Sequence, residues 1–193
     1  MLASDLPPGE KWRKFELKAL GLRDFARVRL DQPLNPFNLA RFANLLVLDF
    51  EQIKGLNEVT REHLLGAGVE SWSGGACTLP NGSKLVILNP THGRSRTNAT
   101  LMEEICHVFL GHQTNRLSVV TKDERGNVMS RDYRKADEEE AYGVGAAALV
   151  PYVSLRRMLA SGKSIKDIAA RFHVSLSLVE YRMKVTKLWR MYR

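Results

Sequence analysis

Hydrophobic and polar residues recur along this chain with two different periods, which separate the expected helices from the expected strands. Apolar residues recur at helical spacing over residues 101–112, where Gly111 is a natural stop signal. A second helical pattern runs over residues 134–149 and is stopped by Pro151. A shorter helix is predicted over residues 39–44.

Strands are predicted where short apolar runs lie between turn residues. Residues 45–48 are one such run. Residues 72–79 and 83–88 flank Pro80, Asn81 and Gly82, and an Asn-Gly pair tolerates the positive φ of a tight hairpin turn. Two further short strands are predicted to pair with each other, over residues 117–121 and 127–129.

The segment after Pro151 has a different pattern. Ser164 and Asp167 have the spacing of a capping box at the start of a helix. Residues 173–174 form a short turn, after which Ser175 is placed to cap a second helix. Two helices joined by a tight turn are typical of a helix-turn-helix.

These elements predict an α+β fold with a small antiparallel sheet. A chain of 193 residues fits one domain with a small appendage. We expect an N-terminal extension over residues 1–35, where no clear pattern is found, followed by the main domain over residues 36–151. A basic, helix-turn-helix-like segment then covers residues 152–193.

The net charge of +8 is concentrated at the C-terminal end. Residues 151–193 contain ten basic and two acidic residues, whereas the first 150 residues contain 19 of each. A neutral body with a basic tail favours an anionic partner such as DNA for the tail. A solvated basic surface without a partner is the alternative.

The sequence gives no sign of a membrane segment or a disulfide framework. No apolar run approaches the roughly 18 residues of a spanning helix, and residues 1–8 lack the apolar core of a signal peptide. The two cysteines, Cys77 and Cys106, are too few for a disulfide framework, and Cys106 fits a small apolar core position. We therefore expect a cytoplasmic protein with reduced thiols.

The helix over residues 101–112 carries the candidate chemistry. Residues four apart share a helix face, so Glu103 and His107 point the same way, with Glu104 alongside. The zinc-peptidase signature His-Glu-x-x-His differs from this stretch only at Glu103, which replaces the first histidine. Glu104 then corresponds to the general base and His107 to a metal ligand, while the Glu103 carboxylate can also ligate a metal.

Each of these residues also has a structural interpretation. Glu103 can cap the helix N-terminus by bonding back to Thr100. His107 can be a core histidine with its hydrogen bonds satisfied, and Glu104 can be a partly exposed surface residue. Two carboxylates with one histidine also suit harder divalent cations better than they suit zinc.

A third ligand is expected from the acidic start of the helix over residues 134–149. Glu138 shares a helix face with small residues suited to close helix packing. Glu139 and Glu140 point elsewhere and are expected to be solvated. The remaining candidate ligands are His92, in a polar loop over residues 89–96, and His112, which is expected at the end of the central helix.

Together these motifs resemble the ImmA/IrrE family of zinc metallopeptidase-like proteins, from about Pro36 to Lys187. The stretches that carry the resemblance are residues 72–75, 86–92, 100–112, 138–151 and 168–175. The chain departs from the family at Glu103, where the family has histidine, and at Tyr142, where asparagine is common.

The resemblance implies a zincin-like metallopeptidase fold with zinc bound by two helix histidines and a later glutamate. It also implies cleavage of a partner protein, often a DNA-binding repressor. Carried over to this chain, Glu104 is the base, His107 a ligand and Glu138 the third ligand. The two functional hypotheses are a metal-dependent endopeptidase with an altered ligand set and a catalytically silent regulator that binds DNA or protein.

Overall fold

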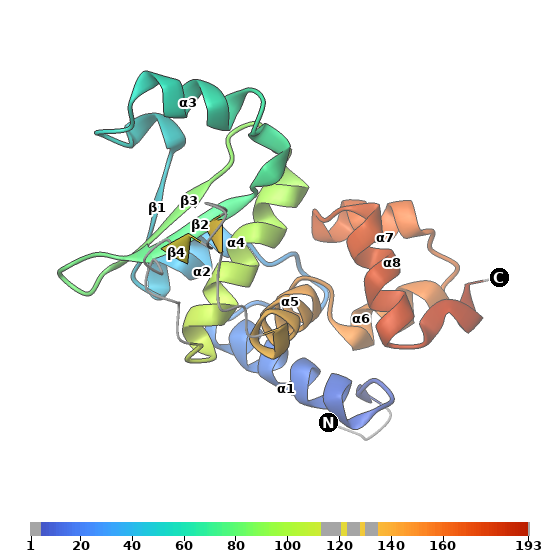
Figure 1. Cartoon of the computed structure of the whole chain (residues 1–193). Helices are drawn as coiled ribbons and strands as arrows, with labels where there is room; N and C mark the ends of the chain where they lie inside the picture. The colour runs from blue at the N-terminus through green and yellow to red at the C-terminus, as the bar shows by residue number, and fades with distance from the viewer. Residues whose placement is uncertain (1–4, 113–120, 123–127, 130–134, 193) are drawn as a thin grey trace.

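The computed structural model describes residues 5–112, 121–122, 128–129 and 135–192 (Figure 1). In this part of the chain, no helix is both long enough and apolar enough to cross a membrane. The helices are α1 (Glu10–Phe25), α2 (Pro36–Phe42), α3 (Glu58–Leu65), α4 (Arg94–Phe109), α5 (Lys135–Leu149), α6 (Tyr152–Ala160), α7 (Ile165–Phe172) and α8 (Leu176–Val185). The strands are β1 (Leu45–Leu48), β2 (Gly74–Thr78), β3 (Lys84–Leu88), β4 (Thr121–Lys122) and β5 (Val128–Met129), and the short 3-10 helices are η2 (Phe50–Gln52), η3 (Val69–Ser71) and η4 (Leu188–Met191).

The main sheet has three strands in the order β1-β3-β2, and its strand positions agree with the sequence prediction. β2 and β3 form the predicted hairpin, with Gly74 opposite Leu88 and Gly82 in the turn at a φ of +82°. β1 pairs with β3 in parallel, with Leu45 opposite Lys84. The sheet is therefore mixed and not wholly antiparallel as predicted, and the parallel strands β1 and β3 are joined by a long connection that contains α3 and β2. The predicted α+β class is confirmed.

A second, two-stranded sheet is formed by β4 and β5, which pair antiparallel with Thr121 opposite Met129. This agrees with the predicted pairing of residues 117–121 with 127–129. The remaining residues of that prediction, 117–120 and 127, lie outside the described residues.

α4 begins earlier than the sequence pattern indicates. The pattern predicts a helix from residue 101, but α4 starts at Arg94 after the N-cap Gly93, so the predicted loop over residues 89–96 is wrong at its end. Arg94 and Arg96 are exposed. Polar residues on the solvent side of a helical turn add no apolar periodicity, so the pattern misses the first turns of α4. α5 occupies its predicted range almost unchanged.

α5 lies between α4 and α1 and packs closely against both of them (Figure 1). A Cβ atom on Gly143 would lie only 2.6 Å from the Phe15 ring of α1. On the other side, a Cβ on Gly145 would lie 3.4 Å from the Met102 side chain of α4. The close approach of α5 to α1 therefore requires a glycine at position 143, whereas a Cβ at position 145 would be in ordinary van der Waals contact with α4.

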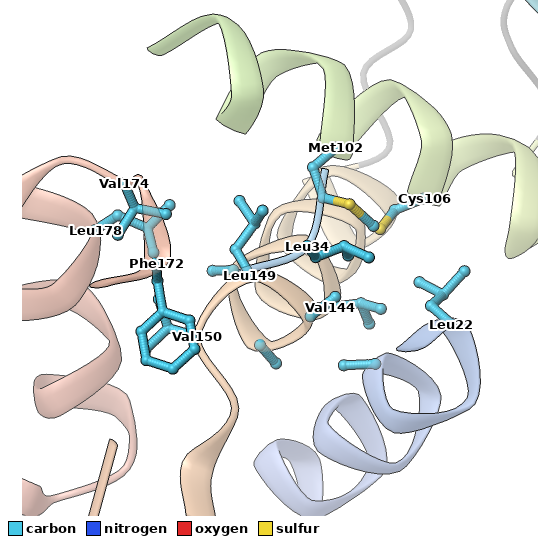
Figure 2. Close-up of a cluster of buried hydrophobic side chains, with 14 of the residues drawn as sticks. Leu22, Leu34, Met102, Cys106, Val144, Leu149, Val150, Phe172, Val174 and Leu178 are labelled. Carbon is cyan, nitrogen blue, oxygen red and sulfur yellow. The ribbon is translucent and has the colours of Figure 1, made fainter. Parts of the chain in front are cut away.

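The hydrophobic core extends from this helix layer to the C-terminal helices (Figure 2). Side chains from α1, α4, α5 and α7 gather around Val144 and Leu149 of α5. Cys106 is fully buried here, as expected for a small apolar core residue. Phe172 is buried in the same cluster, so α7 is part of the core.

α7 and α8 start at the capping residues that the sequence predicts, and the predicted turn separates them. The Ser164 and Asp167 side chains form the capping box of α7. His173 has left-handed backbone angles and ends α7, and the Ser175 hydroxyl accepts a hydrogen bond from Leu178 N at 3.2 Å at the start of α8. α7 and α8 are therefore two short helices joined by a turn.

A buried ion pair between Glu16 and Arg182 joins α1 to α8. The Arg182 guanidinium donates from Nη2 to Glu16 Oε2 at 2.5 Å and from Nε to the Val150 carbonyl at 3.0 Å. The backbone N–H of Tyr152 donates to the other Glu16 oxygen at 2.7 Å. Both charged side chains are only 1% exposed, and they satisfy each other in the interior.

We predict that Arg182→Met lowers the free energy of unfolding by about 3–5 kcal/mol, because it leaves the Glu16 carboxylate buried without its counter-charge. Urea denaturation followed by circular dichroism measures this loss. The exposed pair Glu10–Lys14 is the control, and Lys14→Met should cause no measurable change. Equal, small effects of the two substitutions would contradict the role assigned to Arg182.

Candidate metal centre

Three of the four predicted site residues meet between α4 and α5. Glu103 and His107 lie one turn apart on α4, and Glu138 lies in the first turn of α5. One ligand atom from each of these three residues lies within 4.8 Å of the other two. His107 Nε2 and Glu138 Oε2 are 3.5 Å apart, and all three residues are half-buried.

The close packing of α4 and α5 explains why these side chains meet. Gly145 faces Met102 and Cys106 of α4, and a Cβ at this position would be in van der Waals contact with both side chains. Glu138 lies almost two turns before Gly145, on the same face of α5. The face that packs against α4 therefore also carries Glu138 to His107.

Burial and neighbouring carboxylates shift the proton equilibria of this cluster. Burial, followed by the charges of Glu138 and Glu104, raises the pKa of Glu103 to about 7. Burial lowers the pKa of His107, and the nearby Glu138 carboxylate only partly opposes this shift. In the metal-free centre the His107 imidazole is therefore neutral at neutral pH. The carboxylates repel one another, and this repulsion disfavours the ionised form of Glu103.

Glu104 lies next to Glu103 on α4 and is half-buried. Its charge contributes to the raised pKa of Glu103, so it lies within electrostatic reach of the three-residue cluster. The alternative in which Glu103 caps the helix is wrong. Because α4 begins at Arg94, Thr100 lies in the helix interior, and Glu103 lies beyond the first turns.

The cluster provides ligands of the kind that a divalent cation requires. An imidazole nitrogen and carboxylate oxygens are ordinary zinc ligands, with bonds of about 2.0–2.2 Å. Two such ligands in tetrahedral geometry lie about 3.4 Å apart, which is close to the 3.5 Å between His107 and Glu138. The negative charge that raises the pKa of Glu103 also favours a bound cation. The residues present therefore fit a divalent metal ion.

His92, the first remaining candidate ligand, does not join the cluster in the described part of the chain. Its ring nitrogens are inaccessible to solvent and have no hydrogen-bond partner among the described residues. Burial, followed by the positive charge of Arg96, lowers its pKa.

His112 and Glu140 lie closer to the centre than the sequence predicts. His112 Nδ1 is 3.1 Å from His107 Nδ1, and His112 Nε2 is 3.2 Å from Glu140 Oε2. The expectation that Glu140 is solvated is wrong. Burial alone would raise the pKa of Glu140, but hydrogen bonds from Lys18 and His112 hold it below its usual value.

The turn that follows α4 explains the position of His112. Gly111 has a φ of +69°, and the His112 backbone N–H donates to the His107 carbonyl at 3.0 Å. This turn brings the His112 side chain back beside His107. The glycine is recognisable in the sequence as a stop signal, but the direction of the chain after it is not.

We predict that Glu103→Gln changes the pH dependence of stability in the metal-free protein. The folded-state pKa of Glu103, about 7, exceeds the ordinary value of 4.5, so the folded protein binds this proton more tightly than the unfolded chain. The resulting stabilisation is fully present below pH 4.5, declines as the pH rises, and is lost above pH 7. Urea denaturation in the presence of a chelator measures the free energy of unfolding at each pH. The difference in this free energy between wild type and Glu103→Gln should change with pH between 4.5 and about 7 and stay constant outside this range. Parallel stability curves would contradict the raised pKa.

Comparison with known proteins supports this structural picture. A search of curated protein sequences found no significant match. A transcriptional regulator from Mycobacterium tuberculosis shares the fold, with a TM-score of 0.54 and 14% sequence identity. The match covers 89% of this chain and 46% of the regulator, so the chain spans about half of that protein. The sequence profile of the IrrE N-terminal-like domain matches residues 53–184, which confirms the resemblance to the ImmA/IrrE family. The chain belongs to this family of metallopeptidase-like domains.

Proposed function

We propose that this protein is a metal-dependent endopeptidase that acts on a regulatory protein, such as a DNA-binding repressor. The observation that carries the proposal is the convergence of Glu103, His107 and Glu138, with Glu104 beside them, in a domain of this family. The solved neighbour is itself a transcriptional regulator, which is consistent with a regulatory setting. We expect the protein to act in the cytoplasm, where thiols such as Cys106 stay reduced.

In this proposal, His107 Nε2 and the carboxylates of Glu103 and Glu138 hold a zinc ion or another divalent cation. When bound, the ion would polarise the peptide carbonyl and lower the pKa of a water molecule. Glu104 takes a proton from the attacking water and passes it to the leaving amine nitrogen. Glu104 therefore acts as the general base and then as the general acid.

The ligand set also bears on which ion is bound. With one imidazole and two carboxylates, the centre has one nitrogen donor fewer than the two-histidine sites of its relatives. Carboxylate oxygens favour harder cations such as Mn²⁺, whereas imidazole favours zinc. We therefore expect weaker zinc binding and stronger competition from Mn²⁺ than in a site with two histidines.

We predict that the wild-type protein binds about one Zn²⁺ or Mn²⁺ ion per chain and that His107→Ala abolishes binding. Isothermal titration calorimetry and elemental analysis of protein purified without chelator measure the stoichiometry. Glu139→Gln is the control, because Glu139 pairs with Lys11 on the surface and should not affect metal content. No metal in the wild type, or full metal content in His107→Ala, would contradict the proposal.

The variant Glu104→Gln separates metal binding from catalysis. This variant should keep its metal but cleave about 10²–10⁴-fold more slowly, because only the proton transfer is lost. Mass spectrometry of new N-termini in a protein extract from the source organism detects the cleavage. Equal cleavage rates for the wild type and Glu104→Gln would exclude Glu104 as the general base.

The alternative is a catalytically impaired regulator that binds DNA or protein through its basic C-terminal segment, residues 152–193. The observation that favours it is a series of basic side chains that remain exposed at this end of the chain, including Lys184, Lys187 and Arg190. Lys and Arg side chains of this kind neutralise DNA phosphates. Arg182 in the same segment is excluded, because it is buried against Glu16.

Because this segment supplies buried residues such as Phe172 and Arg182, its deletion is expected to unfold the protein, and substitution is the appropriate test. If the protein binds DNA, replacing Lys184, Lys187 and Arg190 by Gln should weaken binding to a fluorescent mixed-sequence duplex. A plot of log affinity against log salt concentration should become less steep, by about 0.9 in slope for each phosphate that is no longer neutralised. The control replaces Arg27, Arg41 and Lys54, which are exposed elsewhere. Equal salt slopes for both triple variants would contradict the alternative.

A further inference from the structure

A line of hydrogen-bonded side chains leads away from His107 on the side of its Nδ1 atom. His107 Nδ1 lies 3.1 Å from His112 Nδ1, and the two rings meet edge to face. His112 Nε2 lies 3.2 Å from Glu140 Oε2, and Lys18 donates to the other Glu140 oxygen. The His112 side chain is only 8% exposed. The line therefore joins α4, α5 and α1 behind the metal centre.

The chemistry of the donors and acceptors determines in which direction each hydrogen bond in this line is donated. The Glu140 carboxylate bonds the Lys18 ammonium and can only accept hydrogen bonds. His112 must therefore carry its proton on Nε2 to bond Glu140. When His112 is neutral, it has only this one N–H, so its Nδ1 is an acceptor.

With His112 neutral, this arrangement determines the tautomer of the neighbouring His107. Because His112 Nδ1 is an acceptor, His107 must donate from its own Nδ1 across the 3.1 Å contact. A neutral His107 then has no proton on Nε2, and this is the atom that lies 3.5 Å from Glu138 Oε2. A nitrogen lone pair and a carboxylate oxygen thus face each other, an arrangement that a cation between them stabilises.

We propose that His112 and Glu140 are positioning residues that hold His107 in the Nδ1–H tautomer, with the Nε2 lone pair directed toward Glu103 and Glu138. The proposal rests on the proposed function in that His107 is the ligand being oriented. The second ring nitrogen of a metal-bound histidine usually carries a proton and donates a hydrogen bond to an acceptor that fixes the orientation of the ring. In this chain the acceptor is a second histidine, which is in turn fixed by the Glu140–Lys18 pair.

A neighbouring ion pair provides a matched comparison. Lys11 and Glu139 join the same two helices, α1 and α5, one residue before Glu140 along α5. Both side chains of that pair are largely exposed, whereas the carboxylate that bonds His112 belongs to Glu140. Glu139→Gln and Glu140→Gln therefore make the same chemical change on the same pair of helices, but only the second alters the carboxylate that holds His112.

The test measures the affinity of wild type and variants for Zn²⁺ and Mn²⁺ by competition with a chelating dye. We expect His112→Ala to weaken binding of the preferred ion about 10–100-fold, as loss of such partners does elsewhere. Glu140→Gln should weaken it less, because the Gln oxygen can still accept a hydrogen bond from His112 Nε2 but the negative charge is lost. Glu139→Gln should bind like wild type. His112→Asn should recover part of the loss, because its side-chain oxygen can accept the hydrogen bond from His107 Nδ1.

A second readout, on metal-free protein, is long-range ¹H–¹⁵N NMR of the imidazole nitrogens. The wild type should show the proton of His107 on Nδ1, and His112→Ala should give a mixture of tautomers. If His112→Ala does not fold, the comparison of Glu140→Gln with Glu139→Gln carries the test. Wild-type affinity and an unchanged tautomer in both His112→Ala and Glu140→Gln would overturn the proposal, as would a wild-type His107 protonated on Nε2.

The two readouts also separate this proposal from the proposed function. If the wild type binds neither ion but His107 loses its tautomer in His112→Ala, the positioning role stands and the metallopeptidase function fails. If the wild type binds metal and the variants bind it equally well, the positioning role fails and the proposed function stands.

Discussion

The close approach of α5 to α4 and α1 is the constraint on which the rest of the structure depends. At Gly143 a Cβ would lie 2.6 Å from the Phe15 ring of α1, which leaves no room for a side chain, and at Gly145 a Cβ would already be in van der Waals contact with Met102 of α4. Protein interiors of this density tolerate few changes of volume, so the spacing between these helices is fixed. Every polar group at the proposed centre is carried by one of these three helices or by the turn that follows α4.

Three consecutive glutamates on α5 show what this packing does to chemically identical groups. Glu138 faces His107, Glu139 pairs with Lys11 at the surface, and Glu140 bonds His112 and Lys18. Because successive residues on a helix point about 100° apart, one acidic turn can supply a candidate ligand, a surface ion pair and a support for a histidine. The role of each carboxylate is therefore set by the neighbouring helix and not by the local sequence.

The parts of the site that depend on spacing within one element are predictable from the sequence. The pairing of Glu103 with His107 follows from helix geometry, and Glu138 follows from its face of small residues and from the family resemblance. The contacts of His112 and Glu140 are not predictable in this way, because they depend on the turn at Gly111 and on Lys18 from a distant helix. The pattern of apolar residues over residues 1–35 also does not predict α1. The role of this helix becomes clear only from its packing against α5 and from its buried Glu16.

In the proposed centre, the carboxylate at position 103 replaces the usual histidine as a metal ligand. Anomalous diffraction from crystals grown with Zn²⁺ or Mn²⁺ tests this replacement most directly, because it locates the ion itself. We expect one ion about 2.0–2.2 Å from His107 Nε2 and from carboxylate oxygens of both Glu103 and Glu138. An ion bound without Glu103, or one bound away from His107 and Glu138, would contradict the proposed centre.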